Sequence, residues 1–442
     1  MAGLLLAIGV AVAVLALSAT GSHPRHAQAT VARAATPPPP PPPKPRPAAR
    51  DEAWPFYGYD LARTRFFPDP AKLDPPFRVG WKFHDGALLE FPPVIYHNTL
   101  YFEDAGGFAR AVSTTNGHVL WVRRIGTLAA ASPGLDIRHK LVFFTLLSAI
   151  PGASQPGNGR VVALSMKTGH IVWSHALPAG SESSPLVHGL SVFVGDAGGA
   201  VYSFRTYDGH LNWSFHASGA VKGGVAFAHD TIYFGDYGGH VYAVNGANGH
   251  EIWSAGGGGT FYSTPAVAFG RVYLGNTSGE VYAFWASSGA QAWSASTGAY
   301  VYASPAVAVV PGLGPTVYIG SYDGTLYAYD ALSGGVRWSH AAGGRIDGSP
   351  TVLGKVVYYS DLGSNRSAGL DLRTGRQVFS FPDGEFTPVI ADGKVVFLIG
   401  YSTIYQMLPK HLPHAFEARR RSARGKPRIE ARRRRARGKR SR

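Results

Sequence analysis

Short apolar runs separated by glycine-containing turns recur along the chain between residues 54 and 409. Runs such as TIYFG (from Thr231) and RVYLG (from Arg271) are continuous rather than alternating, which is typical of strands that are covered on both faces. The phrases around them repeat, as in GHVYAVNGANGHEIWS (from Gly239) and GEVYAFWASSGAQAWS (from Gly279). Glycine at the turns permits the positive φ that tight hairpins need. The pattern predicts an all-β fold of short, hairpin-linked strands.

An aromatic residue closes each phrase at regular intervals. The aromatic positions are Trp81, Trp121, Trp173, Trp213, Trp253, Trp293, Trp338 and Phe379. Four of the seven intervals are 40 residues long, and the others are 41, 45 and 52. A period of about 40 residues with strand-like runs indicates a β-propeller with one four-stranded blade per repeat. We expect these large rings to be structural, packed between neighbouring blades.

The ends of the repeat array predict how the ring closes. Seven complete units lie between Trp81 and Phe379, followed by the strand-like runs FTPVI, KVVFLIG and TIYQML, and one run, FRVGWKF, comes before them. Three C-terminal strands and one N-terminal strand make an eighth blade. Such closure removes the two free sheet edges of an open array. We therefore predict an eight-bladed β-propeller of antiparallel blades, with seven blades as the alternative.

The segments outside the repeats differ from them in composition. Residues 1–22 carry an uncharged apolar run that is borderline in length for a membrane span, and we interpret them as an apolar helix that serves as a signal peptide or a membrane anchor. Residues 23–53 are a proline-rich linker, 54–409 the propeller, and 410–442 a disordered Arg-rich tail. We expect an exported or membrane-tethered protein. The absence of basic residues before the apolar run leaves a cytoplasmic-facing topology open.

The net charge of +15 belongs to the ends of the chain and not to the propeller. Residues 410–442 carry fifteen basic side chains against two acidic ones, whereas 51–409 carry 22 basic and 25 acidic side chains. We expect the tail to bind an anionic membrane or wall polymer. Nucleic acid is the alternative partner, but the tail lacks interleaved aromatics, which argues against sequence-specific recognition.

The repeated phrase A-x-x-x-x-[ST]-G-x-x-x-W, as in Ala283 to Trp293, resembles the pyrroloquinoline quinone (PQQ) repeat. The resemblance covers about residues 54–409. It implies one of two branches: quinoprotein dehydrogenases, or a non-catalytic branch similar to the propeller lipoprotein of the outer-membrane β-barrel assembly machine. The enzymes hold PQQ over Ca²⁺, often above a vicinal disulfide. This chain has no cysteine, and no full Glu/Asn/Asp calcium set aligns, so we expect no cofactor, with PQQ and Ca²⁺ as the alternative.

A repeated position three residues before a Ser-Pro or Thr-Pro pair should lie at the mouth of the central channel. It holds Glu90, Ala130, Glu182, Lys222, Tyr262, Tyr302, Asp347 and, allowing for a shorter connection, Glu385. Such a mixed ring of acids, tyrosines and one lysine predicts a binding mouth for a small polar ligand or a peptide. Ordinary solvated loops would also favour these residue types. One unit departs from the pattern, because Gly224-Val225 replaces its Ser-Pro.

Other polar positions do not indicate a metal or catalytic site. Four histidines sit three residues before successive tryptophans (His118, His170, His210 and His250), but equivalent positions on different blades cannot converge on one ion. Asp196, Asp236 and Asn276 precede tight turns and are expected to cap them. We therefore predict no metal site and no catalytic residues. The function expected is a monomeric, non-enzymatic scaffold of the cell envelope that binds an envelope protein or peptide, with a PQQ-dependent oxidoreductase as the alternative.

Overall fold

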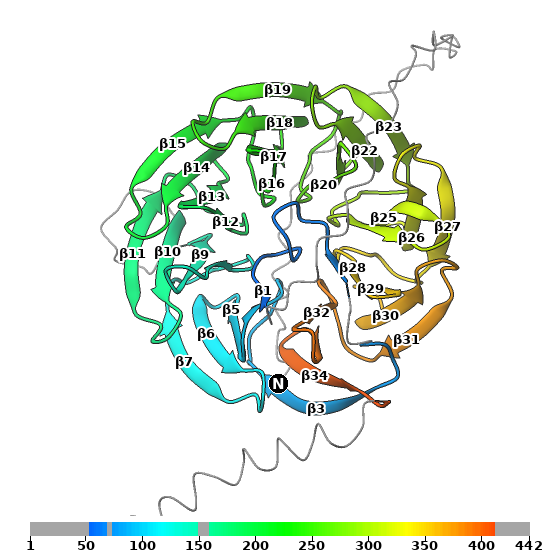
Figure 1. The fold of residues 1–442 in the computed structure, drawn as a ribbon, viewed down its shortest axis with the longest axis horizontal. Coiled ribbons are helices and arrows are strands. Elements are labelled where there is room, and N and C mark those ends of the chain that lie inside the picture. Colours follow the sequence, from blue (N-terminus) through cyan, green and yellow to red (C-terminus); the bar gives the residue numbers. More distant parts are fainter. Residues whose placement is uncertain (1–52, 69–72, 149–158, 412–442) are drawn as a thin grey trace, which may run out of the picture. The chain divides into compact units, whose positions relative to one another are not determined.

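The repeats fold into a ring of eight antiparallel sheets. A computed structural model describes residues 53–68, 73–148 and 159–411, all of which belong to one compact unit, Pro42–Arg442. The sheets contain four repeat strands each and surround a central axis (Figure 1). The described residues form no helix. The predicted all-β, eight-bladed propeller is confirmed, and the seven-bladed alternative is wrong.

Each of the first four blades runs outward from the axis in chain order. Blade 1 consists of β4 (Val94–Tyr96), β5 (Thr99–Glu103), β6 (Phe108–Ser113) and β7 (Val119–Arg124). Blade 2 consists of β8 (Gly134–Asp136), β9 (Leu141–Leu146), β10 (Gly159–Ser165) and β11 (Ile171–Leu177). Blade 3 consists of β12 (Leu186–His188), β13 (Ser191–Gly195), β14 (Ala200–Arg205) and β15 (Leu211–His216). Blade 4 consists of β16 (Ala226–Ala228), β17 (Thr231–Gly235), β18 (His240–Asn245) and β19 (Glu251–Gly256).

The next three blades repeat this order, and the eighth does not. Blade 5 consists of β20 (Ala266–Ala268), β21 (Arg271–Gly275), β22 (Glu280–Trp285) and β23 (Gln291–Ser296). Blade 6 consists of β24 (Ala306–Val310), β25 (Gly314–Gly320), β26 (Thr325–Asp330) and β27 (Val336–Ala341). Blade 7 consists of β28 (Thr351–Leu353), β29 (Val356–Asp361), β30 (Arg366–Asp371) and β31 (Gln377–Phe381). Blade 8 consists of β32 (Val389–Ala391), β33 (Val396–Ile399), β34 (Thr403–Pro409) and the N-terminal strand β3 (Phe77–His84).

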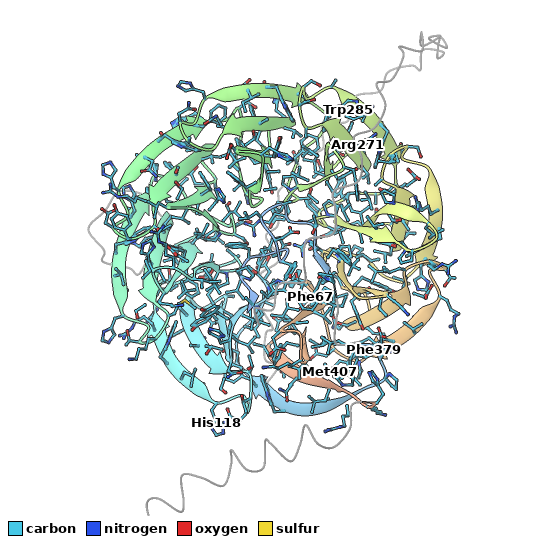
Figure 2. The ribbon with its side chains drawn as sticks, in the orientation of Figure 1. Phe67, His118, Arg271, Trp285, Phe379 and Met407 are labelled. Carbon is cyan, nitrogen blue, oxygen red and sulfur yellow. The ribbon has the colours of Figure 1, made fainter. Side chains whose placement is uncertain are left out.

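The repeated tryptophans lie at the seams between blades. Each indole Nε1 donates a hydrogen bond to a backbone carbonyl of the next blade at 2.7–3.2 Å, the acceptors being Thr114, Met166, Thr206, Gly246, Ala286, Ala331 and Leu372. Each ring also rests on a glycine of that blade. A Cβ built on Gly289, whose φ is +71°, would approach the Trp253 ring to 2.5 Å. Phe379, labelled in Figure 2, lacks an N–H. It instead meets Phe77 edge-on at a centroid distance of 5.4 Å.

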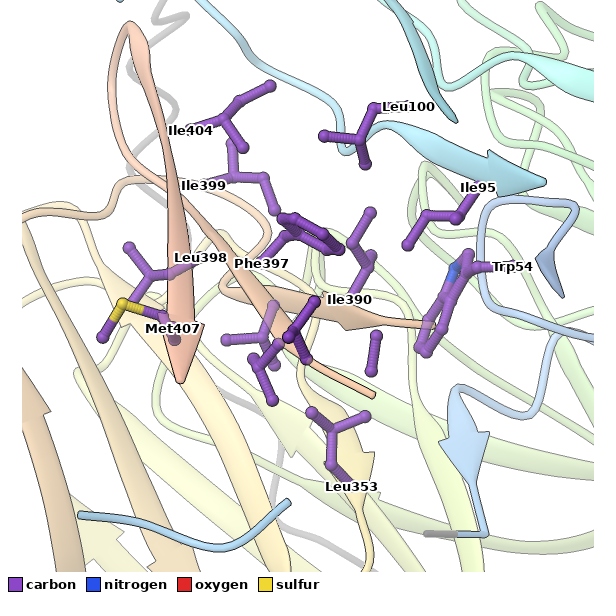
Figure 3. Close-up of a cluster of buried hydrophobic side chains, with 14 of the residues drawn as sticks. Trp54, Ile95, Leu100, Leu353, Ile390, Phe397, Leu398, Ile399, Ile404 and Met407 are labelled. Carbon is purple, nitrogen blue, oxygen red and sulfur yellow. The ribbon is translucent and has the colours of Figure 1, made fainter. Parts of the chain in front are cut away.

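The two ends of the propeller meet in blade 8. Strand β3 pairs with β34 along its length, from Phe77 opposite Pro409 to His84 opposite Thr403. A buried cluster holds this junction together and draws on Trp54 from the N-terminal segment, on Ile95 and Leu100 of blade 1 and on the apolar face of blade 8 (Figure 3). Closure by strands from both ends, as predicted from the sequence, leaves no sheet unpaired in the ring.

Several expectations fall outside the described residues. These are the signal or anchor at 1–22, nearly all of the linker at 23–53, and the tail beyond His411. Among the residues that are described, no helix is long and apolar enough to span a membrane.

Candidate functional site

The N-terminal segment 53–67 lies inside the ring of blades (Figure 1). Its strand β1 (Ala53–Trp54) pairs with β4 of blade 1, and its strand β2 (Phe66–Phe67) pairs in parallel with β28 of blade 7. Between these strands, backbone carbonyls of the segment accept N–H groups of inner strands in five blades, the donors being Leu135, Phe227, Val267, Val307 and Val352. The segment thus pairs inner-strand groups that would otherwise face an open channel. We call residues 53–67 the plug.

A buried arginine attaches the plug to the one unit that departs from the repeat. Arg63 Nε donates to the Val225 carbonyl at 2.9 Å, and its terminal nitrogens donate to the carbonyls of Ser184, Pro185 and Tyr57. Burial lowers the pKa of Arg63 to about 9, so the guanidinium remains charged at neutral pH. The side chain is 1% exposed. The unit in which Gly224-Val225 replaces Ser-Pro is therefore also a unit to which Arg63 fastens the plug.

Hydroxyl groups link neighbouring blades around the plug. The Ser184 hydroxyl accepts the Ser132 N–H, and the Ser304 hydroxyl accepts the Thr264 N–H, both at 3.0 Å. The Ser349 hydroxyl accepts the Ser304 N–H at 2.8 Å. These residues occupy the Ser-Pro and Thr-Pro positions of the repeat. The inner ends of the blades are therefore fixed relative to one another, which makes the mouth a rigid surface.

The mouth is a hollow above the plug with an empty volume of about 530 Å³, part of it open to solvent. Six of the predicted mouth residues line it: Glu90, Glu182, Lys222, Tyr262, Tyr302 and Asp347. Tyr57 of the plug also lines the hollow, and its hydroxyl lies 3.0 Å from the Ser349 hydroxyl. Two predicted positions do not line it. Ala130 is buried, and at the last position the neighbours Phe386 and Thr387 reach the hollow in place of Glu385.

One carboxylate of the mouth is fully compensated. Glu182 accepts a hydrogen bond from Lys222 Nζ at 3.0 Å and one from the Tyr262 hydroxyl at 3.0 Å. These three residues come from three successive blades. An ammonium and a phenol together hold this carboxylate in a fixed position. Glu182 therefore orders one side of the mouth.

The remaining carboxyl groups of the mouth are compensated only in part. Burial, reinforced by the charges of Glu182, Asp347 and Glu385, raises the pKa of Glu90 to about 7. Burial also raises the pKa of Asp347 to about 6, although Tyr322 and Arg345 oppose this shift. Burial and the charge of Asp347 raise the pKa of Glu385. The mouth thus carries negative charge that its own residues do not neutralise.

Tyrosines form a continuous wall beside the mouth, and two of them, Tyr262 and Tyr302, line the hollow. Tyr262 meets Tyr302 edge-on at a centroid distance of 5.3 Å, and Tyr302 meets Tyr322 at 5.0 Å. Tyr237 joins the wall at 6.2 Å from Tyr262. Burial raises the pKa of Tyr237, Tyr262 and Tyr322, so their hydroxyls stay protonated and can donate.

Sequence reasoning missed the tyrosines of the wall that lie outside the repeated mouth position, and it missed the plug. Tyr237 and Tyr322 belong to the turns GDYGG and GSYDG, where the equivalent turn GDAGG has alanine. The presence of tyrosine where the equivalent turn has alanine was the sequence signal that could have revealed the wall. Tyr57 belongs to the segment WPFYGYDLARTRF, which has no counterpart in the repeat.

A Glu103 carboxyl group lies buried at the end of β5, outside the mouth. It is 4% exposed, and burial together with the nearby Asp104 raises its pKa well above the usual range. In blades 3 to 6 the equivalent position is glycine, the four residues being Gly195, Gly235, Gly275 and Gly320. Because the Glu103 carboxyl does not line the hollow, Glu103 is not part of the mouth.

Comparison with known proteins decides the family. A family model described as outer membrane protein assembly factor BamB, one of the PQQ-repeat families, matches residues 145–255 and 277–399. These segments make up more than half of the chain. The chain belongs to this PQQ-repeat family. Searching the curated proteins gives no match.

Solved structures of PQQ-repeat propellers share its fold. BamB from Moraxella catarrhalis superposes with a TM-score of 0.62 at 16% identity, covering 77% of this chain and 100% of that one. Quinohemoprotein alcohol dehydrogenase from Comamonas testosteroni superposes with a TM-score of 0.67 at 14% identity, covering 83% of this chain and 82% of that one. At these identities the likeness establishes the fold alone, and both an assembly factor and an enzyme appear among the relatives.

The mouth does not fit PQQ held over calcium. Among the described residues, no three His, Cys, Asp or Glu side chains lie close enough to hold a metal ion. Glu182 is already engaged by Lys222 and Tyr262, and Glu90 and Asp347 come from connections to different blades. Calcium requires six to eight oxygen ligands. We therefore derive no reaction step through this cofactor.

The charge at Glu90 makes stability depend on pH. Because the folded protein raises the pKa of Glu90 to about 7, ionising this group destabilises the fold progressively above its ordinary pKa of about 4.3 and fully above pH 7. Glu90→Gln is therefore expected to raise the free energy of unfolding by about 1–3 kcal/mol at pH 8, with the gain vanishing near pH 4. Urea denaturation across this pH range measures it. Glu251→Gln, at an exposed position, is the control and should show no such trend.

A loss of stability in Glu90→Gln at every pH would contradict this account, because it would mean that the ionised carboxylate has a stabilising partner.

Proposed function

We propose that the chain is a non-catalytic binding or assembly scaffold of the cell envelope and that its partner is held at the mouth. The observation that carries the proposal is the acidic, tyrosine-lined hollow above the plug, whose carboxyl groups are compensated only in part. The plug lies inside the ring, which supports binding from one side and argues against passage through the ring. Membership of a family described by an outer-membrane assembly factor supports the envelope as the location.

The chemistry of the mouth favours a cationic group on the ligand. Glu90 and Asp347 are partly buried carboxyls with raised pKa values, and a nearby cation would favour their ionised forms. The rings of Tyr262 and Tyr302 line the hollow and add cation–π attraction for an ammonium or guanidinium. A peptide or envelope protein that presents lysine or arginine meets both requirements.

Capture from envelope extracts by the immobilised full chain tests this proposal. A partner bound at the mouth should be retained by the wild type and at least about tenfold less by Glu90→Gln/Asp347→Asn, because charge pairs that are lost from an interface typically cost more than 1.4 kcal/mol. Asp208→Asn/Glu251→Gln removes two acids from turns and strand ends on the opposite face and should retain the partner fully. Equal retention by both variants would contradict binding at the mouth.

The alternative function is a PQQ-dependent oxidoreductase, and equilibrium binding tests it directly. Stoichiometric uptake of PQQ with Ca²⁺, a red-shifted quinone absorbance and dye-linked oxidation of an alcohol or sugar would replace the scaffold proposal. The second alternative, nucleic-acid binding through residues 410–442, would appear as DNA binding that weakens steeply with salt and disappears when those residues are deleted.

A further inference from the structure

The strand order sorts the connections of the propeller onto two faces. Within each of the first seven blades the innermost strand starts next to the mouth, and successive strands alternate in direction. The turns between the second and third strands, and the links between blades, therefore lie on the mouth face. The turns between the first and second strands, and between the third and fourth, lie on the opposite face, which we call the base.

The described turns of the base are rich in basic residues and histidine. Their lysines and arginines are Arg138, Lys140, Lys167, Lys355, Arg373, Arg376, Lys394 and Lys410. Their histidines are His97, His118, His139, His170, His210, His229, His250 and His411. The acids in the same described turns and in the segment before β3 are Asp74, Asp208, Asp230 and Asp392.

The described connections of the mouth face have the opposite composition. Their acids are Asp85, Glu90, Asp104, Glu182, Asp196, Asp236, Asp323, Asp347, Asp383 and Glu385. Their basic residues are Lys222 and Arg345, and none of them is a histidine. A propeller body of nearly neutral net charge is thus polarised between its two faces.

Two acids at strand ends of the base are already occupied. Asp330 pairs with Arg337 at 2.7 Å, and Asp371 accepts the N–H groups of Arg373 and Thr374 in its own turn. By contrast, Lys167, Arg373 and Arg376 are exposed. Positive charge on the base is therefore available to an outside partner.

Both ends of the propeller leave from the base. Ala53 pairs with Tyr96 at the base end of β4. Pro409 pairs with Phe77 at the base end of β3, and the Lys410 N–H donates to the Pro76 carbonyl. The sequence that precedes Ala53 contains the apolar run 2–19, and the sequence that follows Pro409 carries fifteen basic side chains.

We propose that the base is a docking surface for the anionic lipid headgroups of a bilayer, so that the mouth faces away from the membrane. This inference goes beyond the proposed function, because it concerns the opposite face and does not depend on what the mouth binds. Basic side chains near an anionic bilayer contribute about 1 kcal/mol each, within a Debye length of the surface. The described residues begin at Ala53 and end at His411 on this face, so a membrane-bound segment at either end would add effective concentration to these contacts.

A pair of fluorescent labels tests the orientation in the full chain. The chain has no cysteine, so Ala247→Cys on the base and Ala197→Cys on the mouth face each give one labelling site. Both alanines are exposed turn residues. On vesicles of equimolar phosphatidylcholine and phosphatidylglycerol that carry a headgroup quencher, the base label should be quenched much more strongly than the mouth label. Equal quenching of the two labels, or stronger quenching at the mouth, would overturn the proposal.

Charge reversal tests whether the base itself makes the contact. Lys167→Glu/Arg376→Glu should weaken the salt-sensitive part of vesicle binding by at least about fivefold. Arg124→Glu/Arg366→Glu is the matched control, because it makes the same charge change at exposed positions on the mouth side, and it should have a much smaller effect. Equal weakening by both variants, or binding unaffected by the base variant and lost on deletion of residues 412–442, would overturn the role of the base. Tighter binding to a duplex DNA fragment than to the vesicles, lost in the base variant, would replace the bilayer as the occupant.

Discussion

Replacing Arg63 with methionine is expected to lower the free energy of unfolding by about 3–5 kcal/mol. The guanidinium is buried and serves carbonyl oxygens of blades 3 and 4 and of the plug itself. Methionine fills a similar volume but donates nothing, so those carbonyls would remain buried without partners. Chemical denaturation of the full chain, followed by far-UV circular dichroism, measures the loss.

Arg271→Met is the matched control for this prediction. Arg271 donates to the carbonyls of Phe269 and Leu332 and stacks on Trp285, with the guanidinium carbon 4.2 Å from the ring centroid, well away from the plug (Figure 2). Because it holds no plug residue, its loss should cost less than half as much. Equal losses in the two variants would mean that the plug does not fasten blades 3 and 4.

Replacing Trp253 with alanine is expected to cost about 3–5 kcal/mol of stability. The indole is 8% exposed, donates to the Ala286 carbonyl at 2.9 Å and covers Gly289 of the next blade. Its removal leaves a cavity at the seam between blades 4 and 5. Thermal and chemical denaturation measure the effect.

Trp285→Ala provides the comparison, since this tryptophan is partly exposed and lies outside the repeated position. It should cost about 1 kcal/mol. Trp253→Phe keeps a ring at the seam and loses the N–H, so an intermediate loss is expected. A Trp253→Ala protein as stable as Trp285→Ala would contradict a role for the repeated rings in holding the blades together.

The repeat was sufficient to predict the ring. The spacing of about 40 residues predicted one four-stranded blade per repeat. The strand-like runs beyond Phe379 and around Trp81 predicted the ring closure that β34 and β3 form. These features were readable because each blade buries the same faces and needs the same turns. Six of the mouth positions were also placed together, because residues that precede the innermost strand of each blade surround the axis of the ring.

Features that interrupt the repeat could not be predicted from it. The plug occurs once, so no periodicity marks it. Carbonyl groups between Pro55 and Arg65 bind five blades, and backbone groups carry no sequence signal. The exchange to Gly224-Val225 was visible in the sequence, but its partner Arg63 lies more than 160 residues away. Likewise, Glu385 was aligned to the mouth position, yet its shorter connection brings Phe386 and Thr387 to the hollow.

Blade 8 has a consequence for how this protein is made. Strand β3 is among the first parts of the propeller to leave the ribosome, but its partner β34 is the last. Until residue 403 has been synthesised, β3 has no sheet to join and the edge of the growing stack stays uncapped. Contacts so distant in sequence are slow to form, and open edges invite association with other chains. A nascent propeller of this design needs protection for almost the whole of its synthesis, and a chain that stops one strand early loses the closure of the entire ring.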